Sequence, residues 1–113
     1  TGWVQVLRDP RLAKAIYAMH QRPGVNWKVE DLAREAGLSR SLFAERFLAA
    51  TGTTPARYLT ELRMRLAVQY ITHEGQALEK VAFSLGYQSL AAFSRAFKRI
   101  TGQPPGALRA TAR

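Results

Sequence analysis

An internal repeat about fifty residues long limits the possible folds of this chain more than any other feature of its sequence. Leu32-Ala33 with Gly37 returns 49 positions later as Val81-Ala82 with Gly86. A longer group returns 50 positions later: Phe43, Phe47, Thr51-Gly52 and Pro55 match Phe93, Phe97, Thr101-Gly102 and Pro105. The repeat therefore predicts one structural unit that occurs twice, made of a helix, a glycine turn, a second helix, a Thr-Gly stop and a helix begun by proline.

Each copy of the repeat has the pattern of a helix-turn-helix. The alanine four residues before the glycine, such as Ala33 before Gly37, lets two helices cross closely, and the glycine supplies the positive φ of a tight turn. The phenylalanines of each copy are spaced i,i+4, so the second helix buries one face and leaves the other for solvent or for a groove. A duplicated helical hairpin with an ordinary core is the plainer alternative.

Apolar residues at helical spacing, with proline and glycine between the segments, predict an all-α fold. We expect about seven helices, at residues 9–20, 29–36, 40–50, 55–72, 78–85 and 90–100, with a short last one starting near Pro104-Pro105. The helix at 55–72 would be a linker about 27 Å long, with an apolar stripe of Leu59, Leu62, Leu66 and Tyr70. We expect an N-terminal helix-turn-helix subdomain (1–54), a linker helix (55–74) and a C-terminal helix-turn-helix subdomain (75–113), in a homeodomain-like arrangement.

The charge of the chain indicates a polyanionic partner. Seventeen Lys and Arg residues against eight Asp and Glu give a formal net charge of +9, and no acidic residue follows Glu79. Most of the cations are arginine, whose planar guanidinium suits bidentate contact with phosphate and guanine. We interpret this excess as the electrostatic footprint of nucleic acid. A solvated basic surface without a partner is the alternative.

Several classes of protein fit the sequence poorly. The chain has no cysteine, so disulfides, zinc fingers and thiol chemistry are excluded. No apolar run is long enough to cross a membrane, and the N-terminus lacks a signal-peptide pattern, so we expect a cytoplasmic protein without membrane contact. His20 and His73 stand alone, which predicts no metal site, no cofactor and no enzyme. The repeated phenylalanines could stack on single-stranded bases, but their spacing beside Leu and Ala predicts core positions.

The segment from Gly86 to Gly102, followed by Pro104, resembles the signature of the AraC/XylS family of bacterial transcription regulators. The residues from Leu32 to Ser41 and the linker residues Tyr58-Leu59 and Arg63 are similar to the family as well, and the likeness extends from about Asp9 to Arg109. Three positions depart from the usual pattern. Lys28 and Ala77 stand where a Ser or Thr helix cap is common, and Leu108 stands where a tyrosine is usual.

The resemblance implies a bacterial transcription regulator, an activator or a repressor, whose two second helices enter successive major grooves of double-stranded DNA. It also implies a position C-terminal to an effector-sensing domain, absent from this chain, with the subgroup that has a cupin-like sensor as the best match. RNA polymerase would be a partner, and the protein would associate with the nucleoid.

Alignment with the family also implies which residues contact DNA. The predicted base contacts are Arg40, Ser41, Ala44 and Glu45 in the first unit and Leu90, Ala91, Ser94 and Arg95 in the second. Arg95 is the leading candidate, since arginine can donate two hydrogen bonds to guanine; a phosphate contact or a salt bridge is its alternative role. Glu45 could accept from cytosine, pair with an arginine or avoid DNA. The predicted phosphate contacts are Arg46, Lys98 and Arg99.

Two other functions remain open on these residues. A basic protein-interaction module could dock on RNA polymerase or on its own sensor domain, and its DNA binding would then be weak, salt-labile and common to every sequence. An architectural DNA binder would show no preference beyond about tenfold among duplexes. Measured preference among DNA sequences distinguishes both from a specific regulator.

Overall fold

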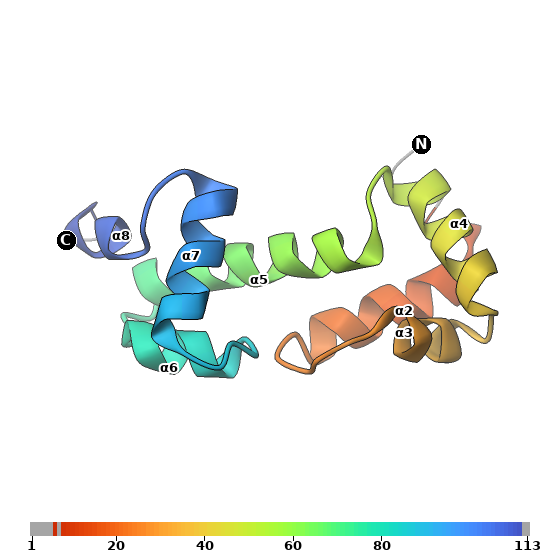
Figure 1. The fold of residues 1–113 in the computed structure, drawn as a ribbon, viewed down its shortest axis with the longest axis horizontal. Coiled ribbons are helices and arrows are strands. Elements are labelled where there is room, and N and C mark those ends of the chain that lie inside the picture. The colour runs from red at the N-terminus through yellow and green to blue at the C-terminus, as the bar shows by residue number, and fades with distance from the viewer. Residues whose placement is uncertain (1–5, 7, 112–113) are drawn as a thin grey trace. The chain divides into compact units, whose positions relative to one another are not determined.

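The computed structural model describes residue 6 and residues 8–111, with side chains as far as residue 108. Seven helices and no strand occur in this part of the chain (Figure 1), which confirms the all-α prediction. They are α2 (Pro10–Gln21), α3 (Val29–Ala36), α4 (Arg40–Thr51), α5 (Pro55–Thr72), α6 (Leu78–Ser84), α7 (Leu90–Thr101) and α8 (Gly106–Thr111).

The chain divides into two compact units within α5, one ending at Leu59 and the other starting at Thr60, called unit 1 and unit 2 below. The outermost parts of the expected subdomains, residues 1–5, 7 and 112–113, lie outside the described residues. The three-part division, with boundaries after residues 54 and 74, stays a prediction.

Side-chain caps set the residues at which α2 and α4 begin. Asp9 stands before α2 rather than in it, because its carboxylate accepts from the backbone N–H of Arg11 and of Leu12, at 3.1 and 3.4 Å. Ser39 caps α4 as expected, since its hydroxyl accepts from Leu42 N at 3.2 Å. Local hydrogen bonding therefore decides where these helices begin.

The core of unit 1 contains the residues that the repeat predicts. Phe43 and Phe47 of α4 are fully buried beside apolar residues of α2 and α3, among them Leu12, Met19, Leu32 and Ala33. Tyr58 of α5 closes this core: its ring meets the Phe47 ring edge-on at 5.6 Å, and its hydroxyl hydrogen-bonds His20 Nε2 at 2.8 Å. His20 thus joins α2 to the start of α5 by a polar contact at the edge of the core.

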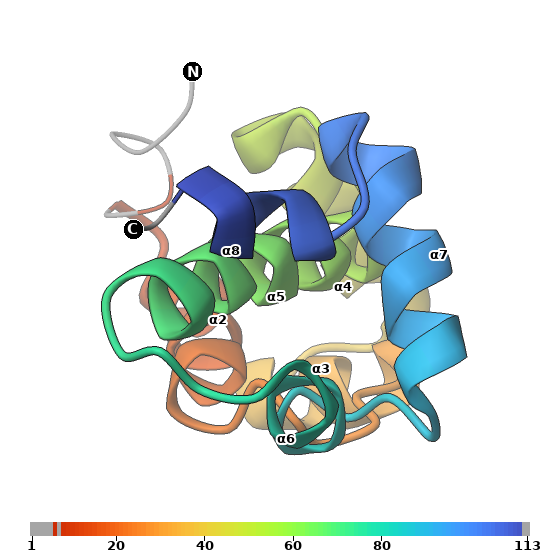
Figure 2. The same cartoon turned by 90° about the vertical axis from the view of Figure 1, so that its left-hand side faces the viewer.

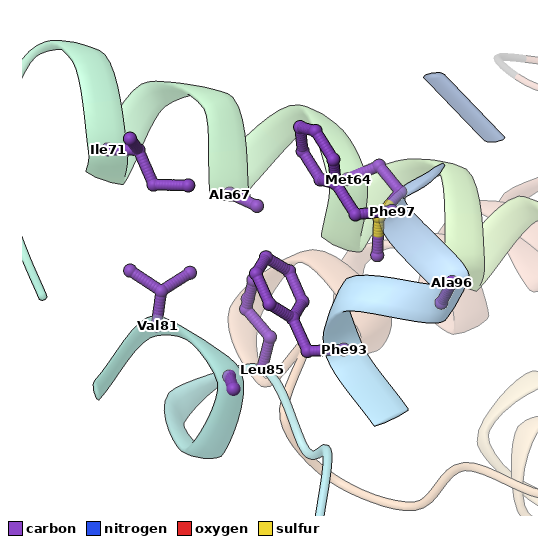
Figure 3. Close-up of a cluster of buried hydrophobic side chains, with 9 residues drawn as sticks. Met64, Ala67, Ile71, Val81, Leu85, Phe93, Ala96 and Phe97 are labelled. Carbon is purple, nitrogen blue, oxygen red and sulfur yellow. The ribbon is translucent and has the colours of Figure 1, made fainter. Parts of the chain in front are cut away.

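The core of unit 2 is shown in Figure 3, with the side chains of α5, α6 and α7 directed toward one another. It consists of Met64, Ala67 and Ile71 of α5, Val81 and Ala82 of α6, Leu85, and Phe93, Ala96 and Phe97 of α7. Within this unit α7 stands across α6, and the turn at Gly86 joins them (Figure 2). The second copy of the repeat therefore packs around its phenylalanines as the first does.

The predicted apolar stripe of the linker helix describes its second half only in part, because Leu66 and Tyr70 pack against the core of unit 2 without being its buried residues. Leu59 and Leu62 are buried, but Leu66 and Tyr70 are only partly so. A different set, Met64, Ala67 and Ile71, is buried in unit 2. One straight stripe cannot describe α5, because its two ends contribute to the cores of two units and each core uses its own face of the helix.

Candidate nucleic-acid interface

The turns of the two helix-turn-helix units have the same hydrogen bonds. In unit 1 the backbone N–H of Leu38 donates to Ala33 O at 3.0 Å, and in unit 2 that of Tyr87 donates to Ala82 O at 3.0 Å. Each turn contains the glycine expected there, with φ of 70° at Gly37 and 90° at Gly86. The helices α4 and α7 are therefore the second helices of two like motifs.

The ends of α4 and α7 also match in detail. The Thr51 hydroxyl donates to Phe47 O at 2.7 Å and accepts from Thr53 N at 3.3 Å. Thr101 repeats this arrangement, donating to Phe97 O at 2.7 Å and accepting from Gln103 N at 3.4 Å. The Thr-Gly stop in the sequence is thus a hydrogen-bonded helix end that occurs once in each unit.

Most of the predicted base contacts of unit 1 are exposed along α4. The side chains of Arg40, Ser41 and Glu45 are exposed and that of Ala44 is half-buried. Arg40 is not an isolated cation, because its Nε lies 3.8 Å from Oε1 of Glu30 on α3. Both side chains of this pair are largely solvated, so the pair stabilises the unit by no more than about 1 kcal/mol and can exchange partners at low cost.

In unit 2 the predicted base contacts lie on α7. Ala91 and Arg95 are exposed, while Leu90 and Ser94 are half-buried. Arg95 takes part in none of the ion pairs formed by the described residues. Its guanidinium therefore keeps its full set of donors for an outside acceptor.

The predicted phosphate contacts do not share one environment. Lys98 and Arg99 are exposed in the last turn of α7. Arg46 instead lies near the start of α2, with Nη1 4.0 Å from Asp9 Oδ2. Its counterpart in the repeat, Ala96, is 5% exposed and packs in the core of unit 2. Arg46 is itself exposed, so it differs from Lys98 and Arg99 in having a carboxylate beside it.

Two side chains near α7 have no assigned role in the sequence interpretation. Tyr87 follows the turn glycine of unit 2, and the Arg63 Cζ lies 5.5 Å from the centroid of its ring. Burial raises the pKa of Tyr87 above 10.0, against the opposing effect of Arg63 and Arg99. The repeat could have drawn attention to Tyr87, because the matching position in unit 1 is Leu38 and only the second copy has a hydroxyl there.

The two unusual cap positions behave as the sequence suggests. Lys28 precedes α3 and Ala77 precedes α6, and neither side chain caps its helix. Lysine has no acceptor, so α3 relies on the reverse bond, in which Lys28 N donates to Asp31 Oδ2 at 3.0 Å. Neither motif therefore begins with the side-chain hydroxyl cap that is common at these positions.

In the part of the chain that is described, no three His, Asp or Glu side chains are grouped as metal ligands would be. No helix there is both long and apolar enough to span a membrane. One surface depression of unit 1 is lined by Lys14, Tyr17 and Glu35 among others, and another, at the start of α2, includes Arg46 of α4.

Comparison with known proteins decides the family. A family profile described as a helix-turn-helix domain matches residues 32–111. A Streptomyces lividans protein described as an AraC-like transcription regulator is 43% identical over 106 residues. The DNA-binding domain of AdpA, solved in complex with a target DNA, is 30% identical with a TM-score of 0.83, over 93% of this chain and 94% of that one. The chain belongs to the AraC-type helix-turn-helix DNA-binding domains.

The relatives of this AraC-type domain are longer than the chain. The match covers 94% of the chain but 35% of the Streptomyces lividans protein. The transcriptional activator RclR of Escherichia coli K12 is 41% identical over 106 residues, which are 94% of the chain and 37% of RclR. The chain thus spans about a third of the length of these relatives.

Proposed function

We propose that this AraC-type domain recognises a specific DNA sequence by inserting α4 and α7 into successive major grooves of one duplex. The observation that carries the proposal is the repeat itself, which extends to matching turn and helix-end hydrogen bonds and leaves one face of each second helix exposed. The 18 residues of α5 span about 27 Å. One turn of B-DNA is ~34 Å, so a helix of this length suits two neighbouring grooves.

Sequence readout would depend on a few side chains of each helix. In unit 2, Arg95 would donate to O6 and N7 of a guanine, and Ser94 would contact a neighbouring base. In unit 1, Glu45 would accept from the amino group of a cytosine, flanked by Arg40 and Ser41. Apolar contact with thymine methyl groups would come from Ala44, Leu90 and Ala91.

Phosphate contacts would set the register of the domain on DNA and supply most of its salt-dependent affinity. Lys98 and Arg99 are best suited to this role, because they are exposed and no acidic residue follows Glu79 in the sequence. Arg46 would have to exchange its pairing with Asp9 for a phosphate. It is therefore the weakest of the three predicted phosphate contacts.

The whole protein would act as a transcription regulator, as its relatives are named to be. An effector-sensing domain in the remaining part would control the DNA-binding domain, and RNA polymerase would be the partner through which it activates a promoter. Such a protein would work in the cytoplasm at the nucleoid, and the domain would have no enzymatic activity of its own.

Selection of bound duplexes from a random DNA library, followed by footprinting, tests this function. We expect two short conserved blocks about one helical turn apart, ~10.5 base pairs between centres. A single protected block would mean that only one unit reads DNA. Less than about tenfold preference would favour an architectural binder, and weak, strongly salt-dependent binding to every duplex would favour a protein-docking module.

A further inference from the structure

Three polar side chains of unit 2 converge from three different segments of the chain. They are Arg63 of α5, Tyr87 of the turn and Arg99 of α7. The Arg63 guanidinium lies against the Tyr87 ring, 5.5 Å from its centroid, and hydrogen-bonds the hydroxyl. Arg99 acts on the same hydroxyl electrostatically. The Arg63 charge therefore lies against a neutral phenol, and the Arg99 charge lies within electrostatic reach of it.

This combination of groups has the chemistry of a phosphate site. Each guanidinium presents several N–H donors in a planar fork that fits phosphate oxygens, and a phenol supplies one further O–H donor. Arg99 forms no ion pair with any described residue, and the sequence after Glu79 offers no carboxylate to neutralise it. An anion from outside the chain would be attracted by both guanidinium groups.

The position of these residues fits the edge of a DNA groove. Ala91 and Arg95 lie near the middle of the exposed face of α7. At about 100° per residue, Arg99 lies roughly 80° round the helix from Ala91, to one side of the centre of that face. A helix seated in the major groove has phosphate backbones on its flanks and base edges in front of it.

We propose that Arg63, Tyr87 and Arg99 together bind one phosphodiester of the DNA backbone at the wall of the groove that α7 enters. The inference rests on the proposed function, and it adds the linker helix α5, through Arg63, to the DNA-contacting surface. Unit 1 has no such site, because Leu38 and Ala49 stand at the positions of Tyr87 and Arg99.

Duplexes with one neutral methylphosphonate linkage, placed at each position of the selected site in turn, test the contact directly. The protein is compared with Arg63→Gln, which removes the charge, and with Tyr87→Phe, which keeps the buried ring and removes only the hydroxyl. Arg63→Gln should lower the slope of log K against log salt by about 0.9. Tyr87→Phe should weaken binding about two- to tenfold on every duplex and leave the slope unchanged.

At one linkage the loss from the methylphosphonate and the loss from Arg63→Gln should not add, because both remove the same contact. Arg65→Gln is the matched control: it removes an equal charge from an exposed position of α5, and its loss should add at that linkage. Thermal unfolding checks that each variant folds. If Arg63→Gln does not fold, Tyr87→Phe still tests the phosphate contact. If the loss from Arg63→Gln or from Tyr87→Phe adds to the loss from the methylphosphonate at every linkage, the proposed phosphate site is wrong. The proposed function would still hold in that case if the wild-type protein prefers one DNA sequence.

Discussion

Units 1 and 2 share a scaffold but present different chemistry on their second helices. The buried phenylalanines, the turn glycines and the Thr-Gly ends match in both units. The exposed positions do not match. Arg95, Lys98 and Arg99 of α7 correspond to Glu45, Leu48 and Ala49 of α4. The repeat has therefore kept the residues that hold the fold and changed those that can meet a ligand.

This difference suggests that the units contribute to DNA binding in different ways. The exposed cations of α7 are suited to phosphate, and the site proposed around Tyr87 adds to them. In unit 1, Leu48 is 51% exposed, and Arg40 and Arg46 each lie close to a carboxylate of their own unit. We expect unit 2 to supply most of the electrostatic affinity and unit 1 to contribute mainly discrimination between sequences.

The strongest test of this comparison removes the charge of α7. The triple variant Arg95→Ala, Lys98→Ala and Arg99→Ala should bind the selected duplex about a hundredfold more weakly or worse, because one base contact and two phosphate contacts are lost. With two phosphate contacts removed, the salt slope should fall by about 1.8. Fluorescence anisotropy over a range of salt concentrations measures both quantities. A slope equal to that of the wild type would place the electrostatic affinity elsewhere.

Single substitutions in α7 separate base readout from phosphate contact. Arg95→Ala should cost about 1–3 kcal/mol at one or two base pairs and little at other positions. Lys98→Ala should weaken all duplexes about equally and lower the salt slope by ~1. Quantitative binding to a library of site variants measures these profiles. Equal losses on every duplex for Arg95→Ala would remove this residue from base readout.

Placing the cations of α7 at the matching positions of α4 tests whether these side chains account for the difference between the units. The variant Glu45→Arg, Leu48→Lys and Ala49→Arg should bind unselected duplexes several-fold more tightly and show a steeper salt dependence, because three cations are added to the exposed face. Its preference for the selected sequence should decrease. The selected duplex and a scrambled one, measured in parallel, give the ratio. No change on either duplex would show that α4 does not lie against DNA.

The smallest expected effect is the alkaline stability of unit 2. The folded-state pKa of Tyr87 is above the ordinary 10.0 because burial disfavours the phenolate. The stabilisation that this provides is complete below pH 10 and is lost as the pH rises through the higher folded-state value. The free energy of unfolding should therefore fall less for Tyr87→Phe than for the wild type on going to strongly alkaline pH. Urea unfolding at several pH values measures this, and parallel curves for the two proteins would contradict it.

Local patterns in the sequence predicted the architecture well. The helices α3 and α5 have the predicted bounds, and α4 and α7 extend one residue beyond theirs, to the threonines that bond back to the preceding turn. These features depend on residues close in the chain, such as Ser39 with Leu42, so spacing alone reveals them.

Contacts between helices could not be predicted in the same way. The pairs Arg40–Glu30 and Arg46–Asp9 join α4 to α3 and to the start of α2, and the Arg63–Tyr87 contact joins α5 to the turn before α7. Each depends on how two helices pack, which hydrophobic periodicity does not specify. The exposed positions on α4 and α7 follow from helical spacing, but the bases and phosphates that they contact stay predictions.

The continuity of α5 has a consequence for how the chain melts. Tyr58 and Leu59 anchor one end of this helix in the first core, and Met64, Ala67 and Ile71 anchor the other end in the second. Loosening either core frays the backbone ladder on which the neighbouring core depends, so local openings in the two halves should be energetically linked. The substitution Phe47→Ala makes a cavity in the core of unit 1. It should thus also speed amide exchange in unit 2, in the part of α5 that follows Ala67.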